Sequence, residues 1–233
     1  MTRSELDFWA VIPATGKGQR MRANRPKQYL PLGAKTILEH TLDNLLSHPQ
    51  ISGAVLVLNK DDGYWGQLNY QHEKPILLCV GGEQRFHSVL NGLQTLSDKI
   101  NRNAVALIHD AVRPFVLHTD IDRLMMASVC GDDGAILAVP VTDTLKVADN
   151  NHRIQHTQPR EQLWRAFTPQ AFKLDIILRA LEFIIDKGLP VTDDASAMEL
   201  AGYQPKLIAG YSRNIKITQP EDLQLAELLL STQ

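Results

Sequence analysis

The chain has 233 residues, of which 44% are hydrophobic and 21% are charged, and its formal net charge is −2. A chain of this length can form one large folded domain, here residues 1–233, around a full hydrophobic core. The slightly acidic balance argues against a nucleic-acid partner. Because no apolar run approaches the ~20 residues that a membrane span requires, we also expect no membrane association.

The number and surroundings of the cysteines indicate the cellular compartment in which the protein folds. Cys79 and Cys130 are the only cysteines in the sequence, and each lies beside apolar residues. We expect two buried, reduced thiols in place of a disulfide. The first residues also lack the apolar stretch of a secretory signal, so the sequence predicts a cytoplasmic protein.

The predicted elements alternate along the chain. Apolar runs between polar turns predict strands over residues 8–12, 54–58, 76–80, 104–108 and 135–141, and their lack of alternation favours parallel strands in a sheet covered on both faces. The first predicted helix begins at Thr36, which has capping-box spacing to Glu39. Further helices are predicted over residues 85–96, 119–129, 174–185, 194–201 and 220–230. This order predicts an α/β protein with a doubly wound, mostly parallel sheet.

The first predicted strand runs into a loop, residues 13–27, that is rich in glycine and positive charge. Gly16 and Gly18 let backbone N–H groups approach an anion at the carboxyl edge of the sheet, where open α/β folds bind ligands. Five cations and no acid follow between residues 17 and 27: Lys17, Arg20, Arg22, Arg25 and Lys27. A solvated basic loop is the alternative, but the adjoining glycines favour a triphosphate site.

Two common glycine loops do not fit this segment. The dinucleotide-binding fingerprint requires a third glycine where Met21 stands. The pattern of P-loop NTPases, with Lys-Ser/Thr after its last glycine, is also absent. Nucleotidyl transfer is the interpretation that remains.

Asp110 follows the predicted strand over residues 104–108, in the segment His-Asp-Ala-Val-Arg-Pro. We therefore expect this carboxylate and Arg113 at the same sheet edge as the glycine loop, where a Mg²⁺ ion or a substrate hydroxyl fits. An Asp at a strand end is more often a turn or cap residue. Its place beside the glycine loop is what favours a functional role.

Residues 144–157 alternate apolar with polar positions around an Asp149-Asn150-Asn151 turn, which is typical of a β-hairpin. The hairpin carries too few apolar residues to belong to the core. We interpret residues 142–160 as an arm that reaches a second subunit, and a solvated surface hairpin is an equal alternative.

Further polar residues stand at the ends of predicted elements, and each alone is a weak signal. Lys216 alternates with Ile215 and Ile217, as in a half-buried strand that would aim it to the opposite face, so a plain surface lysine is the alternative. Thr192 and Asp193 have the composition of a helix cap.

Eight collinear segments resemble the 2-C-methyl-D-erythritol 4-phosphate cytidylyltransferase family: PATGKGQRM, RPKQYLPL, GGEQRFHSV, HDAVRP, PVTDTLK, RAFTPQAF, TDDASAMEL and NIKITQPEDL. The resemblance covers nearly the whole chain. It implies a variant of the Rossmann fold like that of nucleotide-diphospho-sugar transferases. It also implies a homodimeric, bacterial-type enzyme that needs Mg²⁺ or another divalent cation. Such an enzyme joins CTP to 2-C-methyl-D-erythritol 4-phosphate in isoprenoid precursor synthesis, giving 4-diphosphocytidyl-2-C-methyl-D-erythritol and pyrophosphate.

The resemblance also implies roles for individual residues. The catalytic group would be Arg20, Lys27, Arg160 and Lys216, with Arg20 and Lys27 stabilising the transition state. CTP would contact Pro13, Ala14, Thr15, Gly16, Lys17, Gly18, Gly82, Glu83, Ser88, Asp110 and Ala111. The sugar phosphate would contact Asp110, Arg113, Thr144, Arg160, Thr168, Thr192 and Lys216, and the hairpin would carry Thr144 and Arg160 into the partner's site. Asp110 is the candidate metal ligand, with Mg²⁺ held mainly by the nucleotide phosphates.

Two residues depart from the family pattern: Thr15 replaces a second alanine, and Asp194 stands where glutamate is common. Neither removes a charge used in the chemistry, and the effect of Thr15 depends on where its hydroxyl points. A cytidylyltransferase that uses ribitol 5-phosphate has similar motifs and is an alternative. A non-catalytic nucleotide-binding module is a second one.

Overall fold

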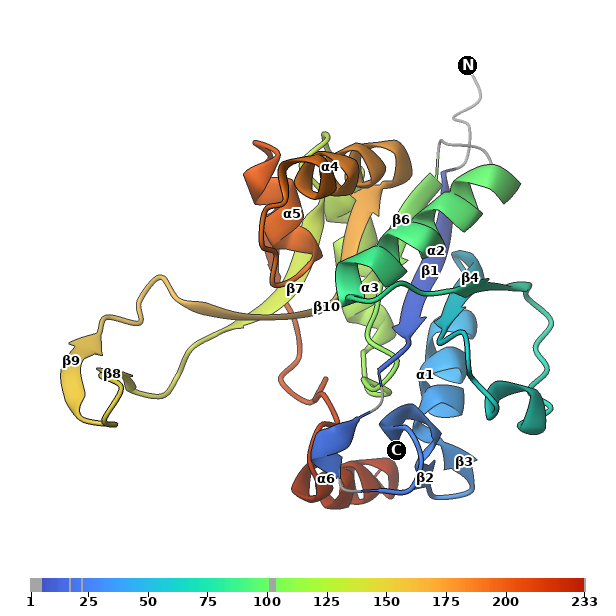
Figure 1. Cartoon of the computed structure of the whole chain (residues 1–233), viewed down its shortest axis with the longest axis horizontal. Coiled ribbons are helices and arrows are strands. Elements are labelled where there is room, and N and C mark those ends of the chain that lie inside the picture. Colours follow the sequence, from blue (N-terminus) through green and yellow to red (C-terminus); the bar gives the residue numbers. More distant parts are fainter. Residues whose placement is uncertain (1–5, 17, 22, 101–103, 233) are drawn as a thin grey trace.

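The computed structural model describes residues 6–16, 18–21, 23–100 and 104–232. A seven-stranded sheet forms its centre, with helices on both faces and a two-stranded arm that projects away from it (Figure 1). In spatial order the strands are β11 (Lys206–Ala209), β7 (Ala135–Pro140), β10 (Trp164–Lys173), β6 (Ala104–Ile108), β1 (Asp7–Ala14), β4 (Ile51–Leu58) and β5 (Ile76–Val80). None of the helices in the described ranges is long and apolar enough to span a membrane.

The sheet is mostly parallel, as predicted. Strands β6, β1, β4 and β5 pair in parallel, and so do β7 and β11. Strand β10 is the exception, because it runs antiparallel to both of its neighbours, β7 and β6. All five predicted strands form, which confirms the α/β class, whereas β10 and β11 were not predicted. The ladder of β10 shifts register between Phe167 and Gln170, around a cis Thr168–Pro169 bond, and proline is unusual inside a strand.

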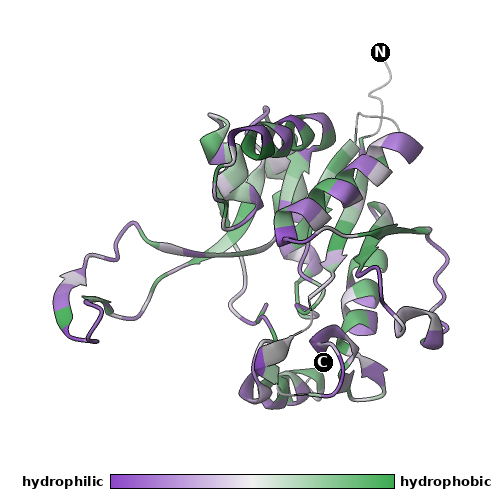
Figure 2. Ribbon diagram, in the orientation of Figure 1, coloured by the Kyte–Doolittle hydropathy of each residue, from purple (hydrophilic) through white to green (hydrophobic). Residues whose placement is uncertain are grey.

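Helices cover both faces of the sheet and bury its apolar residues. On one face lie α2 (Arg85–Lys99), α4 (Leu174–Lys187) and α5 (Asp194–Leu200), and on the other lie α1 (Ile37–Leu46) and α3 (His118–Ser128). Helix α1 begins with the predicted capping box, in which the Glu39 N–H donates to Thr36 Oγ1 and the Thr36 N–H donates to the Glu39 carboxylate. Figure 2 shows hydrophobic central strands and hydrophilic outer helix faces, as expected for a sheet buried on both sides.

A smaller layer lies beyond the carboxyl end of β1 (Figure 1). It contains the short 3-10 helices η1 (Gln19–Met21) and η2 (Lys27–Tyr29), the short strands β2 (Pro31–Leu32) and β3 (Lys35–Thr36), and the last helix, α6 (Pro220–Leu230). Leu32, Phe115, Ile217 and Ala226 pack in a separate hydrophobic cluster there. This cluster brings the chain around residue 217 close to the segment that follows the glycine loop.

The predicted hairpin also forms. Strands β8 (Leu145–Ala148) and β9 (Ile154–Gln158) pair antiparallel, and the Asp149 carboxylate accepts hydrogen bonds of 2.9 Å from the N–H groups of Asn151 and Arg153 in the turn. The arm extends away from the sheet (Figure 1), and its Ile154 is 65% exposed. The fold of this chain alone therefore does not bury the arm.

One detail of the sequence interpretation was wrong. Cys130 is exposed and Cys79 is half-buried, although both are free thiols. Residues 215–218 do not form a strand, yet Ile217 is fully buried while the neighbouring Lys216 is exposed.

A further 3-10 helix, η3 (Trp65–Gln67), lies in the loop between β4 and β5.

Candidate active site

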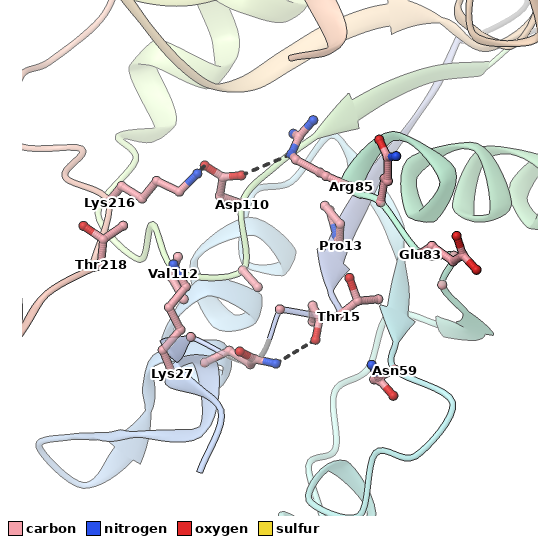
Figure 3. Close-up of a pocket in the computed structure, with 18 of the residues that line it drawn as sticks. Pro13, Thr15, Lys27, Asn59, Glu83, Arg85, Asp110, Val112, Lys216 and Thr218 are labelled. Atoms are coloured by element: carbon pink, nitrogen blue, oxygen red, sulfur yellow. Dashed lines mark hydrogen bonds and ion pairs between the residues drawn. The ribbon is translucent and has the colours of Figure 1, made fainter. Parts of the chain in front are cut away.

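A cavity of about 860 Å³ opens where β1, β4, β5 and β6 end (Figure 3). The predicted site residues that line it are Pro13, Ala14, Thr15, Gly16, Gly18, Arg20, Lys27, Gly82, Glu83, Asp110, Ala111 and Lys216. Lys17, also predicted, lies outside the described residues. The glycine loop, the segment after β5, Asp110 and the distant Lys216 thus face one space at the carboxyl edge of the sheet, where open α/β folds bind ligands.

The two described glycines of the loop serve different purposes. A side chain at Gly16 would meet no protein atom within 4 Å, so this glycine leaves open space where a ligand can approach the backbone. Gly18 has φ +64°, and a Cβ there would lie 2.8 Å from the Cβ of Lys27. Gly18 therefore allows both a left-handed turn and close packing against Lys27. Gln28 fixes the start of the loop, because its Nε2 donates a 2.7 Å hydrogen bond to the Ala14 carbonyl.

The hydroxyl of Thr15 turns toward Ser88. The two hydroxyl oxygens are 3.3 Å apart, and Ser88 Oγ also accepts a 3.2 Å hydrogen bond from the Gly82 N–H. Ser88 is fully buried and supports the two ligand-facing segments without lining the cavity. The Thr15 methyl group fills the space above Gly81, where a Cβ would lie only 2.3 Å from it. The threonine that departs from the family pattern is thus accommodated by packing against Gly81 and Ser88.

Lys27 is a poorly compensated cation. Its Nζ donates a 3.3 Å hydrogen bond to the Ile217 carbonyl. Burial and, next, the positive charge of Lys216 lower the pKa of Lys27 to about 8, against the opposing effect of Asp110. Arg20 and Arg113 add to the lowering. Such an accumulation of positive charge is favourable only when an anion occupies the cavity.

On the side of the cavity opposite the glycine loop, Asp110 lies at the centre of a group of cationic side chains (Figure 3). Its Oδ2 accepts from Lys216 Nζ and from Arg113 Nε, each at 3.0 Å, and Arg85 Nε lies 3.8 Å from Oδ1. Burial by itself raises the pKa of this carboxyl. The charges of Lys216, Arg85 and Arg113 outweigh burial and hold the pKa of Asp110 well below its usual range. Asp110 is therefore ionised throughout the physiological range and orients the cations around it.

The carboxylates of the cavity do not form a metal cage. Within the described residues, no group of three or more His, Cys, Asp or Glu side chains is placed to hold a metal ion. Asp110 already binds two cationic side chains through Oδ2. The donor set fits an ion brought in by phosphate oxygens, which is how Mg²⁺ commonly binds in nucleotide sites.

The remaining predicted residues lie outside the cavity wall. Thr168 supports Asp110 from behind, because its Oγ1 accepts a 3.0 Å hydrogen bond from the Asp110 N–H, and Arg113 packs beside it with its side chain 12% exposed. Thr192 is exposed, just before Asp193, the residue that caps α5. Thr144 and Arg160 lie on the arm, where the Arg160 guanidinium donates to the Thr142 carbonyl.

Several residues of the cavity wall were not predicted: Gln28, Asn59, Lys60, Asp61, Gly81, Gln84, Arg85, Val112 and Thr218. Asn59 directly follows β4, so the same rule that found Asp110 applies to it. Arg85 lies within one of the segments that carry the resemblance, GGEQRFHSV. Nothing in its local sequence distinguishes it from a surface arginine at the start of a helix.

A triphosphate-sized cavity, an open glycine loop and several cations around a single buried carboxylate provide positioning and positive charge without an acid–base pair. Transfer reactions at phosphorus rely on these two effects. The fold and the site thus define an α/β nucleotide-binding enzyme of the nucleotidyltransferase class.

Comparison with known proteins supports this class and narrows it. The model of the family described as IspD, 2-C-methyl-D-erythritol 4-phosphate cytidylyltransferase, matches residues 8–232. A 2-C-methyl-D-erythritol 4-phosphate cytidylyltransferase from Haemophilus influenzae (strain 86-028NP) is 51% identical over 99% of this chain and 98% of its own length. That of Tolumonas auensis is 49% identical over 97% of both chains.

Solved structures agree. The Francisella tularensis enzyme of the same name superposes with a TM-score of 0.82 at 33% identity, covering 95% of this chain and 99% of its own. The Thermus thermophilus enzyme gives a TM-score of 0.79 at 28% identity, covering 97% of this chain and 100% of its own. This chain belongs to the 2-C-methyl-D-erythritol 4-phosphate cytidylyltransferase family.

Proposed function

We propose that this chain joins CTP to 2-C-methyl-D-erythritol 4-phosphate in the cavity described above, giving 4-diphosphocytidyl-2-C-methyl-D-erythritol and pyrophosphate for isoprenoid precursor synthesis. The observation that carries the proposal is that one cavity is lined both by the open loop around Gly16 and by the Asp110–Lys216 ion pair of 3.0 Å. We assign the loop to the nucleotide half of the site and the ion pair to the sugar-phosphate half. Two phosphorylated substrates fit these halves, with Lys27 facing the space between them.

The reaction is a substitution at phosphorus. A phosphate oxygen of the sugar phosphate forms a bond to the α-phosphorus of CTP, and the bond from that phosphorus to the bridging oxygen breaks as pyrophosphate leaves. The attacking oxygen is already anionic, so no general base is needed. Negative charge grows on the α-phosphoryl oxygens and on the leaving group, where Lys27 and Arg20 stabilise it because the cavity wall already holds them in place.

A divalent cation, Mg²⁺ in the first instance, would be held mainly by the phosphate oxygens of CTP, with Asp110 as the candidate protein ligand, and would neutralise part of the phosphate charge. In this arrangement the backbone around Gly16 and Gly18 binds the nucleotide, and Gly82 and Glu83 flank it from the end of β5. Asp110 orients Lys216 and Arg113 for the sugar phosphate and accepts a substrate hydroxyl.

The projecting arm supports a dimeric enzyme with exchanged arms. Arg160 and Thr144 carry polar groups but lie on a hairpin that the described part of this chain leaves exposed, with Ile154 65% exposed. An exposed apolar residue on an extended ribbon favours a protein contact. We assign the arm, residues 142–160, to a homodimer in which Arg160 reaches the sugar phosphate bound by the partner. Residues 1–233 would then act as one cytidylyltransferase domain in the cytoplasm.

The decisive experiment measures pyrophosphate release with the full chain, CTP and Mg²⁺, in parallel with 2-C-methyl-D-erythritol 4-phosphate and with ribitol 5-phosphate. We expect release that depends on the first acceptor and on Mg²⁺. Pyrophosphate release only with ribitol 5-phosphate would refute the proposal and identify the alternative, a cytidylyltransferase that uses ribitol 5-phosphate. CTP binding without release from either acceptor would indicate a non-catalytic nucleotide-binding module.

A further inference from the structure

Arg85, the first residue of α2, makes a two-pronged ion pair with a buried carboxylate. Its Nη1 donates to Asp194 Oδ1 at 2.9 Å, and its Nη2 donates to Asp194 Oδ2 at 2.8 Å. The Asp194 side chain is 1% exposed and that of Arg85 is 33% exposed. Two parallel hydrogen bonds fix the plane of a guanidinium group as well as its position. Arg85 is therefore held in one orientation, although it faces the cavity.

The remaining nitrogen of that guanidinium faces Asp110. Arg85 Nε lies 3.8 Å from Asp110 Oδ1, and Oδ2 of the same carboxylate accepts from Lys216 (Figure 3) and from Arg113. The two oxygens of Asp110 thus have different partners. Oδ2 makes two short bonds, whereas Oδ1 has a cation beside it at a distance that leaves the oxygen able to accept another hydrogen bond.

A second connection runs from the start of α5 toward Asp110. Gln170 is 1% exposed; its Nε2 donates to Asp193 Oδ2 at 2.8 Å, and its Oε1 accepts from the Ala195 N–H at 2.9 Å. Two residues before it, Thr168 accepts the hydrogen bond of the Asp110 N–H at 3.0 Å. The first residues of α5 are therefore linked to the Asp110 carboxylate through Arg85 and to the Asp110 backbone through β10.

We propose that Arg85 is a positioning residue for the sugar-phosphate half of the site. Asp194 fixes its guanidinium group, which in turn directs Asp110 Oδ1 into the cavity to accept a hydroxyl of the acceptor substrate. The same pair holds the start of α5, next to Thr192, at the edge of that half. The inference rests on the proposed cytidylyl transfer. Because the nucleotide half is built from the backbone around Gly16 and Gly82, loss of Arg85 affects the acceptor far more than CTP.

The test uses the full chain with Arg85→Gln, Asp194→Asn and the combined variant, and the exposed pair Arg179–Asp175 supplies the control Arg179→Gln. For Arg85→Gln we expect KM for 2-C-methyl-D-erythritol 4-phosphate to rise about tenfold or more, while the Kd of CTP alone, measured by calorimetry, stays within about threefold. Arg179→Gln should change neither constant. An unchanged acceptor KM in a folded Arg85→Gln protein would overturn the inference.

The combined variant separates positioning from folding. Arg85→Gln leaves the buried Asp194 carboxylate without its cation, and Asp194→Asn leaves the partly exposed Arg85 guanidinium without its partner, so each single change lowers Tm. Removing both charges restores much of the lost stability. We expect Tm to recover in the combined variant and the acceptor KM to stay high. Recovery of both would reduce the pair to a structural role and refute the proposal.

Arg85→Lys gives a second test, since lysine keeps the charge but lacks the fork that fixes a plane. We expect a folded protein whose acceptor KM remains raised, and a normal KM would contradict the inference. If neither Arg85→Lys nor the combined variant folds, Arg85 is a folding determinant and the proposal fails. An inactive wild-type chain in the same assay would count against the proposed function, while an active one with insensitive variants counts against Arg85 alone.

Discussion

The lowered pKa of Lys27 predicts a loss of activity at mildly alkaline pH. Burial, the charge of Lys216 and the weaker effects of Arg20 and Arg113 bring the pKa from its ordinary value of 10.5 to about 8, against the opposing charge of Asp110. Lys27 is thus positive below pH 8 and neutral above it. If Lys27 stabilises the transition state as proposed, that stabilisation is lost as the pH rises through this value.

The size of the effect follows from simple titration. One pH unit above its pKa, about a tenth of a lysine population keeps its proton. Since kcat/KM reports the ionisations of the free enzyme, kcat/KM for CTP should fall about tenfold from pH 7 to pH 9. Bound triphosphate places negative charge beside Lys27 and raises its pKa, so the decline in kcat should begin at higher pH than the decline in kcat/KM.

Lys27→Arg supplies the perturbation, because a guanidinium stays protonated throughout this range. We expect Lys27→Arg to lower activity at pH 7 through altered geometry but to remove the decline between pH 7 and 9. The matched control is Lys35→Arg: Lys35 is 51% exposed, and its hydrogen bond to Asp43 raises its pKa. The control should keep the wild-type profile. If wild type and Lys27→Arg lose activity at the same pH, Lys27 is not the titrating group.

Three further predictions concern the loop, the arm and the chemical step. Lys27→Ala should lower kcat by about 10²-fold and leave the Kd of CTP much less affected, which steady-state kinetics and calorimetry separate. Mixing equal amounts of Arg160→Ala and Lys27→Ala subunits should restore about a quarter of wild-type activity if arms are exchanged within a dimer; a verified mixed dimer without activity would exclude the shared site. Gly81→Ala should weaken CTP binding, because its Cβ would lie 2.3 Å from Thr15 Cγ2, and Thr15→Ala should partly restore it in the double variant.

The strands and helices that the sequence predicted correctly share one property, which is that local pattern decides them. Strand β6 is a continuous buried run of five apolar residues, and the capping box that begins α1 is complete within four residues. Strand β10 was missed because its pattern is interrupted by Pro169 and by the register shift beside it. Its place between β7 and β6 depends on tertiary pairing, which outweighs local propensity.

The residues of the candidate site also separate into those that a local sequence pattern predicts and those that only the tertiary structure reveals. Gly16, Lys27 and Asp110 were predicted from a glycine loop and from the rule that ligands gather at the carboxyl ends of parallel strands, and all three line the cavity. The same rule applied to β4 would have indicated Asn59. The position of Arg85 depends on Asp194, 109 residues further along the chain, and no local pattern carries that information.

Arg85 and Lys27 have different partners, which explains why the cations of one cavity do not all pair with the carboxylate of Asp110. Arg85 is bound by a buried carboxylate outside the cavity, and Lys216 is bound by Asp110. Lys27 instead hydrogen-bonds a neutral carbonyl, so its charge is desolvated and largely uncompensated, as its lowered pKa records. An uncompensated charge raises the free energy of the empty enzyme. It lowers the free energy most where the bound species carries the most negative charge, which in the proposed reaction is the transition state. The feature that makes Lys27 sensitive to pH is therefore the same one that would suit it to the proposed catalytic role.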